Sequence, residues 1–256
     1  MFPTFAATDP IAQFEVKRIF EIENVLGRYD LSFTNASAYM VLGVTFVAGL
    51  FWYSASRTSL VPNRIQSLGE IGYEFVADMI RGVAGEEGLR FFPFVFTLFF
   101  FILAANMIGM VPYAFTTTSH IVVTGALALL VIGIVIVYGL MKNGLGFFKL
   151  FAPSGAPWWI YLLLIPIEII SFLARPLTLA LRLFANMLAG HIMLKLFAGF
   201  AVSLLGAGAV YIPIAALSFG MGVALNALEF LVAFLQAYVF AILTCVYLND
   251  ALHPAH

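Results

Sequence analysis

The sequence has too little charge for a soluble protein and almost no cysteine. Asp, Glu, Lys and Arg make up 10% of the 256 residues, whereas a soluble domain has about 25%. With so little charge the chain cannot cover a surface in water, and we expect it to be embedded in lipid. Cys245 is the only cysteine, which excludes an intrachain disulfide and a cysteine-based metal cluster. We expect no metal and no cofactor.

Two further features are missing from the sequence. The 12 basic and 13 acidic residues nearly balance, so no excess of positive charge is present to attract nucleic acid. The N-terminal region also lacks the order of a cleavable signal peptide, in which a basic segment is followed at once by a short apolar one. Residues 1–33 carry charges of both signs, and the first apolar run starts near Ala38. We interpret this run as a retained membrane anchor, preceded by an outside segment at 1–37.

Long apolar runs dominate what is present, and 63% of the residues are hydrophobic. A helix needs about 20 apolar residues to cross the hydrocarbon core of a bilayer. Spans are predicted at 38–55, 91–115 and 121–141, followed by two longer stretches at 158–205 and 208–250. All must be helical, because lipid cannot satisfy exposed backbone groups. The predicted fold is therefore an all-α integral membrane protein with about five crossing helices in a single membrane domain, residues 1–256.

Residues 64–83 have a different pattern. Their apolar residues recur at helical spacing, while Glu70, Glu74, Asp78 and Arg81 share the opposite side. This pattern predicts an amphipathic helix that lies along the membrane interface or against a partner and does not cross the bilayer.

Lys and Arg in the loops predict the orientation. The basic residues cluster between the first two spans and after the third, at Arg57, Arg64, Arg81, Arg90, Lys142 and Lys149. The loop at 112–120 and the turn at 206–208 have none. Because short basic loops stay on the inside, we expect an outside N-terminus and an inside C-terminus.

The last two apolar stretches are too long for upright spans. A helix of 48 residues would be ~70 Å long, against a hydrocarbon core of ~30 Å. These helices must therefore tilt strongly, kink or break, and Pro166, Pro176 and Pro213 favour bending. Glycines near 206–208 and 220–222 would let the two helices approach closely. This pattern favours a tilted hairpin that embraces a curved partner.

Polar residues inside these two stretches are candidate functional groups, because a charge near the bilayer centre costs about 2.5–3.5 kcal/mol. They are Glu168, Arg175, Arg182, His191, Lys195, Glu229, Gln236 and Asp250. The predicted depths place His191 with Glu229 toward the outside and Glu168 with Asp250 toward the inside. Arg182 falls between the two groups. This order suggests two half-paths for protons separated by a fixed positive charge.

Structural roles are the alternatives for most of these residues. Arg175 and Lys195 could extend to the interface or close an ion pair, Glu168 and Asp250 could anchor helix ends, and His191 could be a packing histidine. Arg182 has the weakest structural alternative, because it is deep and keeps its proton.

Several motifs in order resemble one family. They are RPLTLALRLFANMLAGH at 175–191, ANMIGMVP at 105–112, LE at 228–229, QAYVF at 236–240 and YLND at 247–250. Together they span roughly 90–252 and resemble subunit a of the F-type ATP synthase, the static half of a proton-driven rotary motor. A histidine at 191 with a glutamate at 229 is similar to the mitochondrial and alphaproteobacterial arrangement.

The resemblance implies a role for Arg182 as the essential arginine that faces the carboxylates of a rotating c-ring. It implies that Asn186 and Gln236 are polar neighbours of this arginine. As partners it implies c-ring subunits, peripheral-stalk b-type subunits and other ATP synthase subunits. The chain itself would make and break no ATP bonds.

The resemblance also assigns the proton paths. His191 and Glu229 match the pair of the outer half-channel, which Asn106 would also line. Glu168 and Asp250 match acidic residues of the inner half-channel. The implied location is a bacterial inner membrane, with a mitochondrial inner membrane as the alternative.

Two other functions are weighed against this one. A proton-coupled secondary transporter often contains repeats around a substrate site, and we find no repeat in this sequence. An intramembrane enzyme would need a catalytic motif, and neither H-E-x-x-H nor G-x-S-x-G occurs.

Overall fold

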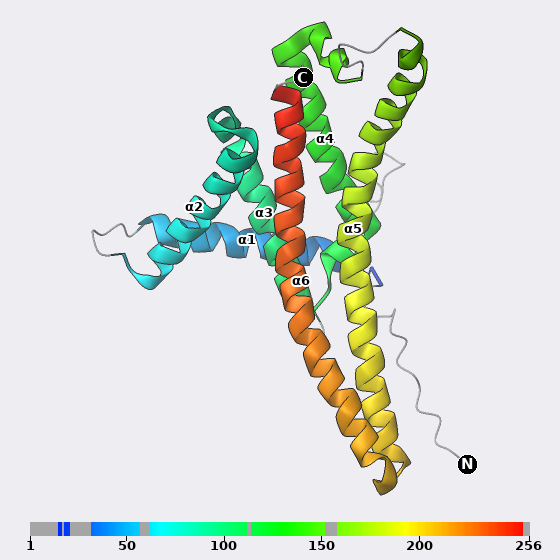
Figure 1. Ribbon diagram of the computed structural model, residues 1–256. Coiled ribbons are helices and arrows are strands. Elements are labelled where there is room, and N and C mark those ends of the chain that lie inside the picture. The colour runs from blue at the N-terminus through cyan, green and yellow to red at the C-terminus, as the bar shows by residue number, and fades with distance from the viewer. Residues whose placement is uncertain are drawn as a thin grey trace.

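The computed structural model describes residues 15–16, 18–20, 32–56, 62–111, 114–151 and 158–252. Most of the predicted N-terminal segment, together with Arg57 and Pro112, lies outside these residues. The described part is almost entirely helical (Figure 1). Its α-helices are α1 Asn35–Ser56, α2 Arg64–Ala84, α3 Phe92–Gly109, α4 Ile121–Asn143, α5 Trp158–Ala207 and α6 Ile212–Leu252.

Short elements connect the helices. The 3₁₀ segments are η2 Glu86–Phe91, η3 Thr117–Ser119, η4 Gly144–Phe151 and η5 Ala209–Tyr211. Before α1, the strands β1 Arg18–Phe20 and β2 Phe33–Thr34 form a two-stranded antiparallel sheet. The sequence does not predict this sheet, because each strand is too short to show an alternating pattern.

Within the residues that the structure describes, five helices are long and apolar enough to cross a membrane: α1, η2 with α3, α4, α5, and η5 with α6. A helix pairs most of its backbone groups within itself, which is what lipid requires. The prediction of an all-α integral membrane protein is confirmed.

The second predicted span ends too late. The helix α3 ends at Gly109 and not at residue 115, and Ala114, Phe115 and Thr116 are not helical. Hydropathy extends the apolar run through Val111, Ala114 and Phe115, but the residue before a proline disfavours helical geometry. Val111 precedes Pro112, and the chain then returns to pack against the helices as η3.

The two longest helices form a hairpin. They join at Gly208, whose φ of 127° favours glycine, and they contact each other extensively. Near this turn, the Ser218 hydroxyl donates to the Phe197 carbonyl at 3.0 Å. Farther along, α6 also packs against α2, α3 and α4. Its fully buried residues there include Ala233, Ala237 and Ala241, because small side chains let helices approach closely.

The long helix α5 continues through Pro166 and Pro176 without a break. In Figure 1 its N-terminal part, which carries both prolines, leans away from α6. A proline inside a helix removes one backbone hydrogen bond and favours such a bend. In Figure 1 the axis of α1 runs across the axis of α5. With 50 residues, α5 is about 75 Å long. Because this length exceeds the ~30 Å hydrocarbon core, a strong tilt of the hairpin stays our prediction.

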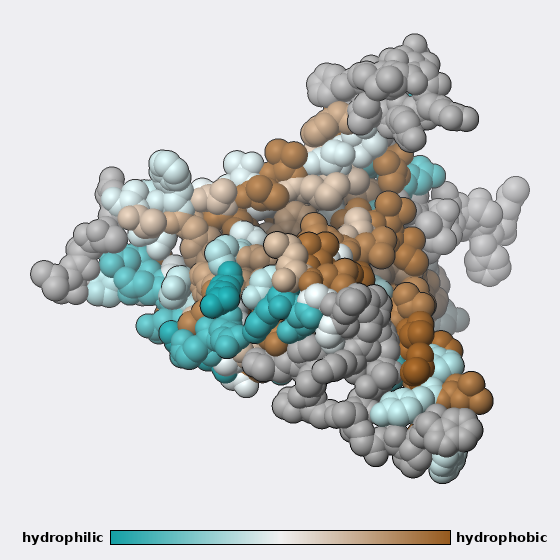
Figure 2. All heavy atoms as spheres, turned by 90° about the horizontal axis from the view of Figure 1, so that it is seen from above, coloured by the Kyte–Doolittle hydropathy of each residue, from teal (hydrophilic) through white to brown (hydrophobic). Residues whose placement is uncertain are grey.

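The amphipathic helix α2 packs one face against α1, α3 and α6. Val76 and Ile80 on this face are fully buried, whereas Glu70, Glu74 and Asp78 are exposed. Figure 2 shows a mostly hydrophobic surface with hydrophilic residues gathered on the side where α2 lies in Figure 1. The arrangement agrees with the pattern read from residues 64–83.

Candidate functional site

Polar side chains are buried together between the end of α3, the η3 segment, α5 and α6. The loop at 114–120, which includes η3, is called the return loop. Five polar residues are buried: Asn106 from α3, Thr116 and Thr118 from the return loop, His191 from α5 and Glu229 from α6. Burying polar groups is costly unless they find partners. A concentration of them inside an apolar bundle therefore marks a candidate site.

His191 and Glu229 face each other across the hairpin. The His191 Nδ1 atom lies 3.6 Å from Glu229 Oε1, just beyond hydrogen-bond distance. The two residues are 7% and 5% exposed. Neither Glu229 oxygen has a hydrogen-bond partner among the described residues. The structure thus brings together the two residues that the sequence groups by depth, and a small movement would let them share a proton.

The return loop holds the other side of the histidine. His191 Nε2 lies 3.0 Å from the hydroxyl oxygen of Thr116, and this hydroxyl donates to the Gly109 carbonyl at 3.3 Å. The imidazole of His191 on α5 therefore lies between Thr116 of this loop and Glu229 of α6.

Asn106 ties three elements together in the same cluster. Its amide nitrogen donates to the Ala233 carbonyl of α6 at 3.1 Å, and its side-chain oxygen accepts a hydrogen bond of 2.8 Å from Thr118. The residue is 0% exposed. These bonds explain why a fully buried amide is tolerated, and they place Asn106 beside the loop that contacts His191.

Two glycines allow this close packing. A Cβ atom on Gly190 would lie 2.7 Å from Glu229 Oε1, and one on Gly109 would lie 2.8 Å from Thr116 Cγ2. Such distances are shorter than real Cβ contacts. Glycine at both positions therefore lets Glu229 and Thr116 lie against neighbouring backbone.

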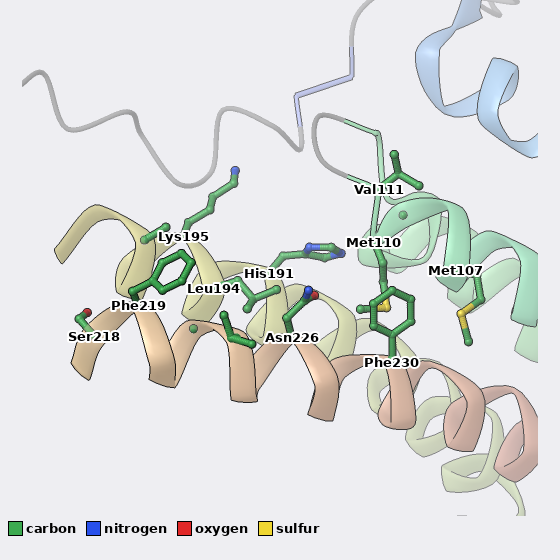
Figure 3. Close-up of a pocket in the computed structure, with 14 residues that line it drawn as sticks. Met107, Met110, Val111, His191, Leu194, Lys195, Ser218, Phe219, Asn226 and Phe230 are labelled. Carbon is green, nitrogen blue, oxygen red and sulfur yellow. The ribbon is translucent and has the colours of Figure 1, made fainter. Parts of the chain in front are cut away.

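A pocket of about 840 Å³ opens beside His191. It lies between the end of α3 and the hairpin, and Lys195, Ser218 and Asn226 are its other polar lining residues. Figure 3 shows the His191 ring directed from α5 toward the end of α3, with Asn226 rising from α6. Because a water molecule takes up about 30 Å³ in the liquid, the pocket has room for many waters that could reach the imidazole.

Arg182 lies on a different face of the hairpin. Both Arg182 and Asn186 are exposed, and Gln236 of α6 is half-buried. Large apolar side chains are exposed on the same two helices, among them Leu177, Leu181, Leu228, Leu231 and Leu235. A cation exposed on an otherwise apolar hairpin in lipid is costly, so Arg182 is a candidate functional residue.

At the other end of the hairpin, Asp250 pairs with Arg175. The Arg175 guanidinium donates to Asp250 Oδ2 at 2.6 Å and lies 5.7 Å and 5.2 Å from the ring centres of Phe172 and Tyr247. The sequence groups Asp250 with Glu168. Within the described part of the chain, half-buried Glu168 forms no hydrogen bond or ion pair, so the structure does not join these two carboxylates.

Sequence reasoning missed the return loop. Thr116, Thr117, Thr118 and Ser119 are all buried. The Phe115 ring stacks on His120 at 4.9 Å. Burial lowers the pKa of His120 below its ordinary 6.5 and so favours the neutral imidazole. The available signal was TTTSH at 116–120, a run of hydroxyls and a histidine in an uncharged loop between two spans.

The fold and site together define a class: a multi-pass membrane protein whose longest helical hairpin carries a buried His–Glu pair and an exposed arginine. The family model of the ATP synthase A chain matches residues 37–249. The chain therefore belongs to the ATP synthase A chain family, and the resemblance predicted from the motif at 175–191 is confirmed.

Curated relatives agree with this assignment along nearly the whole chain. The chain is 74% identical to ATP synthase subunit a of Hyphomonas neptunium over 247 residues, which cover 96% of this chain and 97% of that protein. It is 58% identical to ATP synthase subunit a of Mesorhizobium japonicum over 248 residues, covering 97% and 98% of the two chains. The subunit a of Allorhizobium ampelinum is also 58% identical over 248 residues, with the same coverage.

Proposed function

We infer that this chain is the proton-translocating subunit a of an F-type ATP synthase, the static partner of a rotating c-ring. One observation carries the inference. Exposed Arg182 and the buried His191–Glu229 pair lie on different faces of one helical hairpin. A proton path can therefore run behind the helix that presents the arginine to the ring.

The pocket beside His191 is the proposed outer path. Water in the pocket would deliver a proton to His191 and Glu229, with Asn106 holding the adjacent loop in place. The proton would then neutralise a carboxylate on the ring. A neutral carboxyl group can face lipid, whereas an ionised one pays a large cost, so the ring can turn only after it is protonated.

Glu168 and Asp250 belong to the proposed inner path, where the ring carboxylate releases its proton. Asp250 lies in the ion pair with Arg175, so half-buried Glu168 is the carboxylate better placed to exchange protons with water. Each elementary charge that crosses gains about 2.3 kcal/mol per 100 mV of membrane potential. That gain would drive the rotation.

Arg182 is the proposed barrier between the two paths. Its guanidinium keeps its proton and favours the ionised form of a ring carboxylate as it passes. It also repels a proton that would cross directly from one path to the other. Asn186 and Gln236 would hold polar contacts beside it.

The remaining assignments follow the family. The proposed partners are the c-ring subunits and the b-type subunits of the peripheral stalk, and ATP chemistry would take place on other subunits. The proposed location is a bacterial inner membrane, with the N-terminus outside and the C-terminus inside. A proton-coupled secondary transporter is the alternative, and it predicts transport without a ring.

Replacing Glu229 with glutamine tests the proposed outer path. Glutamine keeps the size of the side chain but cannot exchange a proton, so ATP-driven proton pumping by the reconstituted complex should fall at least about tenfold. Glu70→Gln, on the exposed face of α2, is the matched control and should pump normally. Pumping by Glu229→Gln at the control rate would remove Glu229 from the path.

Replacing Gly190 with alanine tests the geometry of the pair. The new methyl group would displace the Glu229 carboxyl group, whose Oε1 lies 2.7 Å from the Cβ position. Misplacing a reacting group by about 1 Å can cost on the order of 100-fold, so we expect pumping to fall by about 10- to 100-fold in an assembled complex. The control is Gly199→Ala on the same helix, where no atom lies within 4 Å of the Cβ position. Equal pumping by the two variants would contradict the prediction.

A further inference from the structure

The hydroxyl group of Thr116 has two partners that together fix where protons lie. The residue is 0% exposed. Its hydroxyl group donates to the Gly109 carbonyl at 3.3 Å, and the hydroxyl oxygen lies 3.0 Å from His191 Nε2. A threonine hydroxyl has one proton to donate and two lone pairs to accept with.

These contacts select one form of the imidazole. Both hydrogen bonds can form at once only if the single hydroxyl proton is donated to the Gly109 carbonyl and the oxygen accepts from His191. In that arrangement Nε2 carries a proton. A neutral imidazole has a single N–H, so Nδ1 holds the lone pair. This lone pair is on the side of Glu229, whose Oε1 is 3.6 Å away.

We propose that Thr116 is a positioning residue for proton transfer, which holds His191 in the Nε2–H tautomer and directs the Nδ1 lone pair at Glu229. The proposal rests on the proposed function of the His191–Glu229 pair. In the transfer, the O–H bond of the Glu229 carboxyl group breaks and an N–H bond forms at Nδ1. A carboxylate and an imidazolium result, and the reverse step restores both neutral groups.

The same contact serves both states of the histidine. An imidazolium donates from both nitrogens, so Nε2–H still donates to Thr116 after Nδ1 has gained its proton. The ring therefore does not need to turn over when it is protonated. A fixed ring shortens the transfer to one small approach between two side chains.

The loop around Thr116 is built to hold this hydroxyl still. The Ser119 hydroxyl donates to the Thr116 carbonyl at 2.6 Å, and Thr118 donates to Asn106 on the adjacent helix at 2.8 Å. A Cβ atom added at Gly109 would lie only 2.9 Å from Thr116 Oγ1. Thr116 can therefore approach the Gly109 carbonyl, which accepts its hydrogen bond, because residue 109 has no side chain.

The experiment compares Thr116→Val with Thr116→Ser in the complete reconstituted complex. Valine keeps the shape of the threonine side chain but removes the hydroxyl oxygen that accepts from His191. Serine keeps this hydroxyl. ATP-driven proton pumping is measured from about pH 5.5 to 8.5, with assembly checked by subunit content. Thr124→Val is the control, because this buried hydroxyl lies near carbonyls of its own turn, those of His120 and Ile121.

For Thr116→Val we expect about tenfold slower pumping and a pH profile displaced toward lower pH. The displacement follows because the imidazolium would lose one acceptor, while other groups that act on it remain, among them Glu229 on α6 and Lys195 one turn along α5. Thr116→Ser should keep most of the rate and the original profile, and Thr124→Val should match the unmodified complex.

Two results would overturn the proposal. One is a normal rate and pH profile for Thr116→Val. The other is an equal loss for valine and serine without a displaced profile, which would mean that the residue only fills space. Glu229→Gln in the same preparation separates this proposal from the function on which it rests. If Glu229→Gln also pumps normally, the proposed function fails. If Glu229→Gln is inactive while Thr116→Val pumps normally, only the proposed role of Thr116 fails.

Discussion

Replacing Arg182 with alanine is expected to abolish ATP-driven proton pumping in a complex that still assembles. The side chain is exposed on the hairpin and forms no hydrogen bond or ion pair with the described residues, so its removal should leave the fold intact. Without the arginine, an ionised carboxylate of the proposed ring would lie unpaired in an apolar setting, at a cost of about 3 kcal/mol. At about 1.4 kcal/mol per factor of ten, we expect at least a roughly 100-fold loss, measured in reconstituted vesicles.

Arg182→Lys should restore little of the proton pumping that Arg182→Ala loses. Its ammonium group is a compact point charge and cannot offer the planar fork of the guanidinium to a carboxylate. Arg81→Ala is the control, because this arginine is exposed on α2, outside the proposed proton path. It forms ion pairs with Asp78 at 3.3 Å and Glu86 at 3.4 Å. If Arg182→Ala pumps at nearly the normal rate, the barrier role is wrong and the secondary transporter becomes the better reading.

The second large effect is expected when the ion pair between Arg175 and Asp250 is broken by charge reversal. The pair joins α5 and α6 at 2.6 Å, far from the turn at Gly208. Pro176 directly follows Arg175 in α5, and a proline inside a helix weakens it at that point. Removing one partner of a buried pair costs about 3–5 kcal/mol. Because the two side chains here are 24% and 31% exposed, we expect less, about 1–2 kcal/mol.

Arg175→Asp or Asp250→Arg alone should therefore lower the amount of assembled complex by roughly tenfold. The double variant with both changes should recover most of it, since the opposite charges face each other again. Thermal inactivation and subunit content measure the effect. Glu168→Gln, which removes a charge from the same helix without breaking a described ion pair, should leave assembly intact. Failure of the double variant to recover would show that the two positions do not act as a pair.

Much of the architecture is readable from the sequence, because the physics of lipid is simple. Apolar runs of sufficient length must be helices, and α1, α4, α5 and α6 follow the predicted runs within a few residues. Counting residues along two antiparallel helices also places His191 and Glu229 at similar depth. A single charge such as Arg182 stands out in an apolar run without any alignment.

The end of α3 and the return loop could not be read in this way. Hydropathy sees Val111, Ala114 and Phe115 as a continuation of the span, whereas the local backbone preference before a proline ends the helix. Whether a loop then turns outward or packs back depends on the space left between α3, α5 and α6. That space is a property of the packed bundle.

The sequence by itself determined the class of protein, the number of long apolar helices, and the charges that need a functional reason, because hydropathy and the cost of a charge in lipid act residue by residue. Only the tertiary structure decided which of those groups meet. It joined Asp250 to Arg175 and not to Glu168, and it placed the Thr116 hydroxyl against His191. Such contacts depend on the rotation and spacing of packed helices to within about an ångström, which no count along the chain supplies.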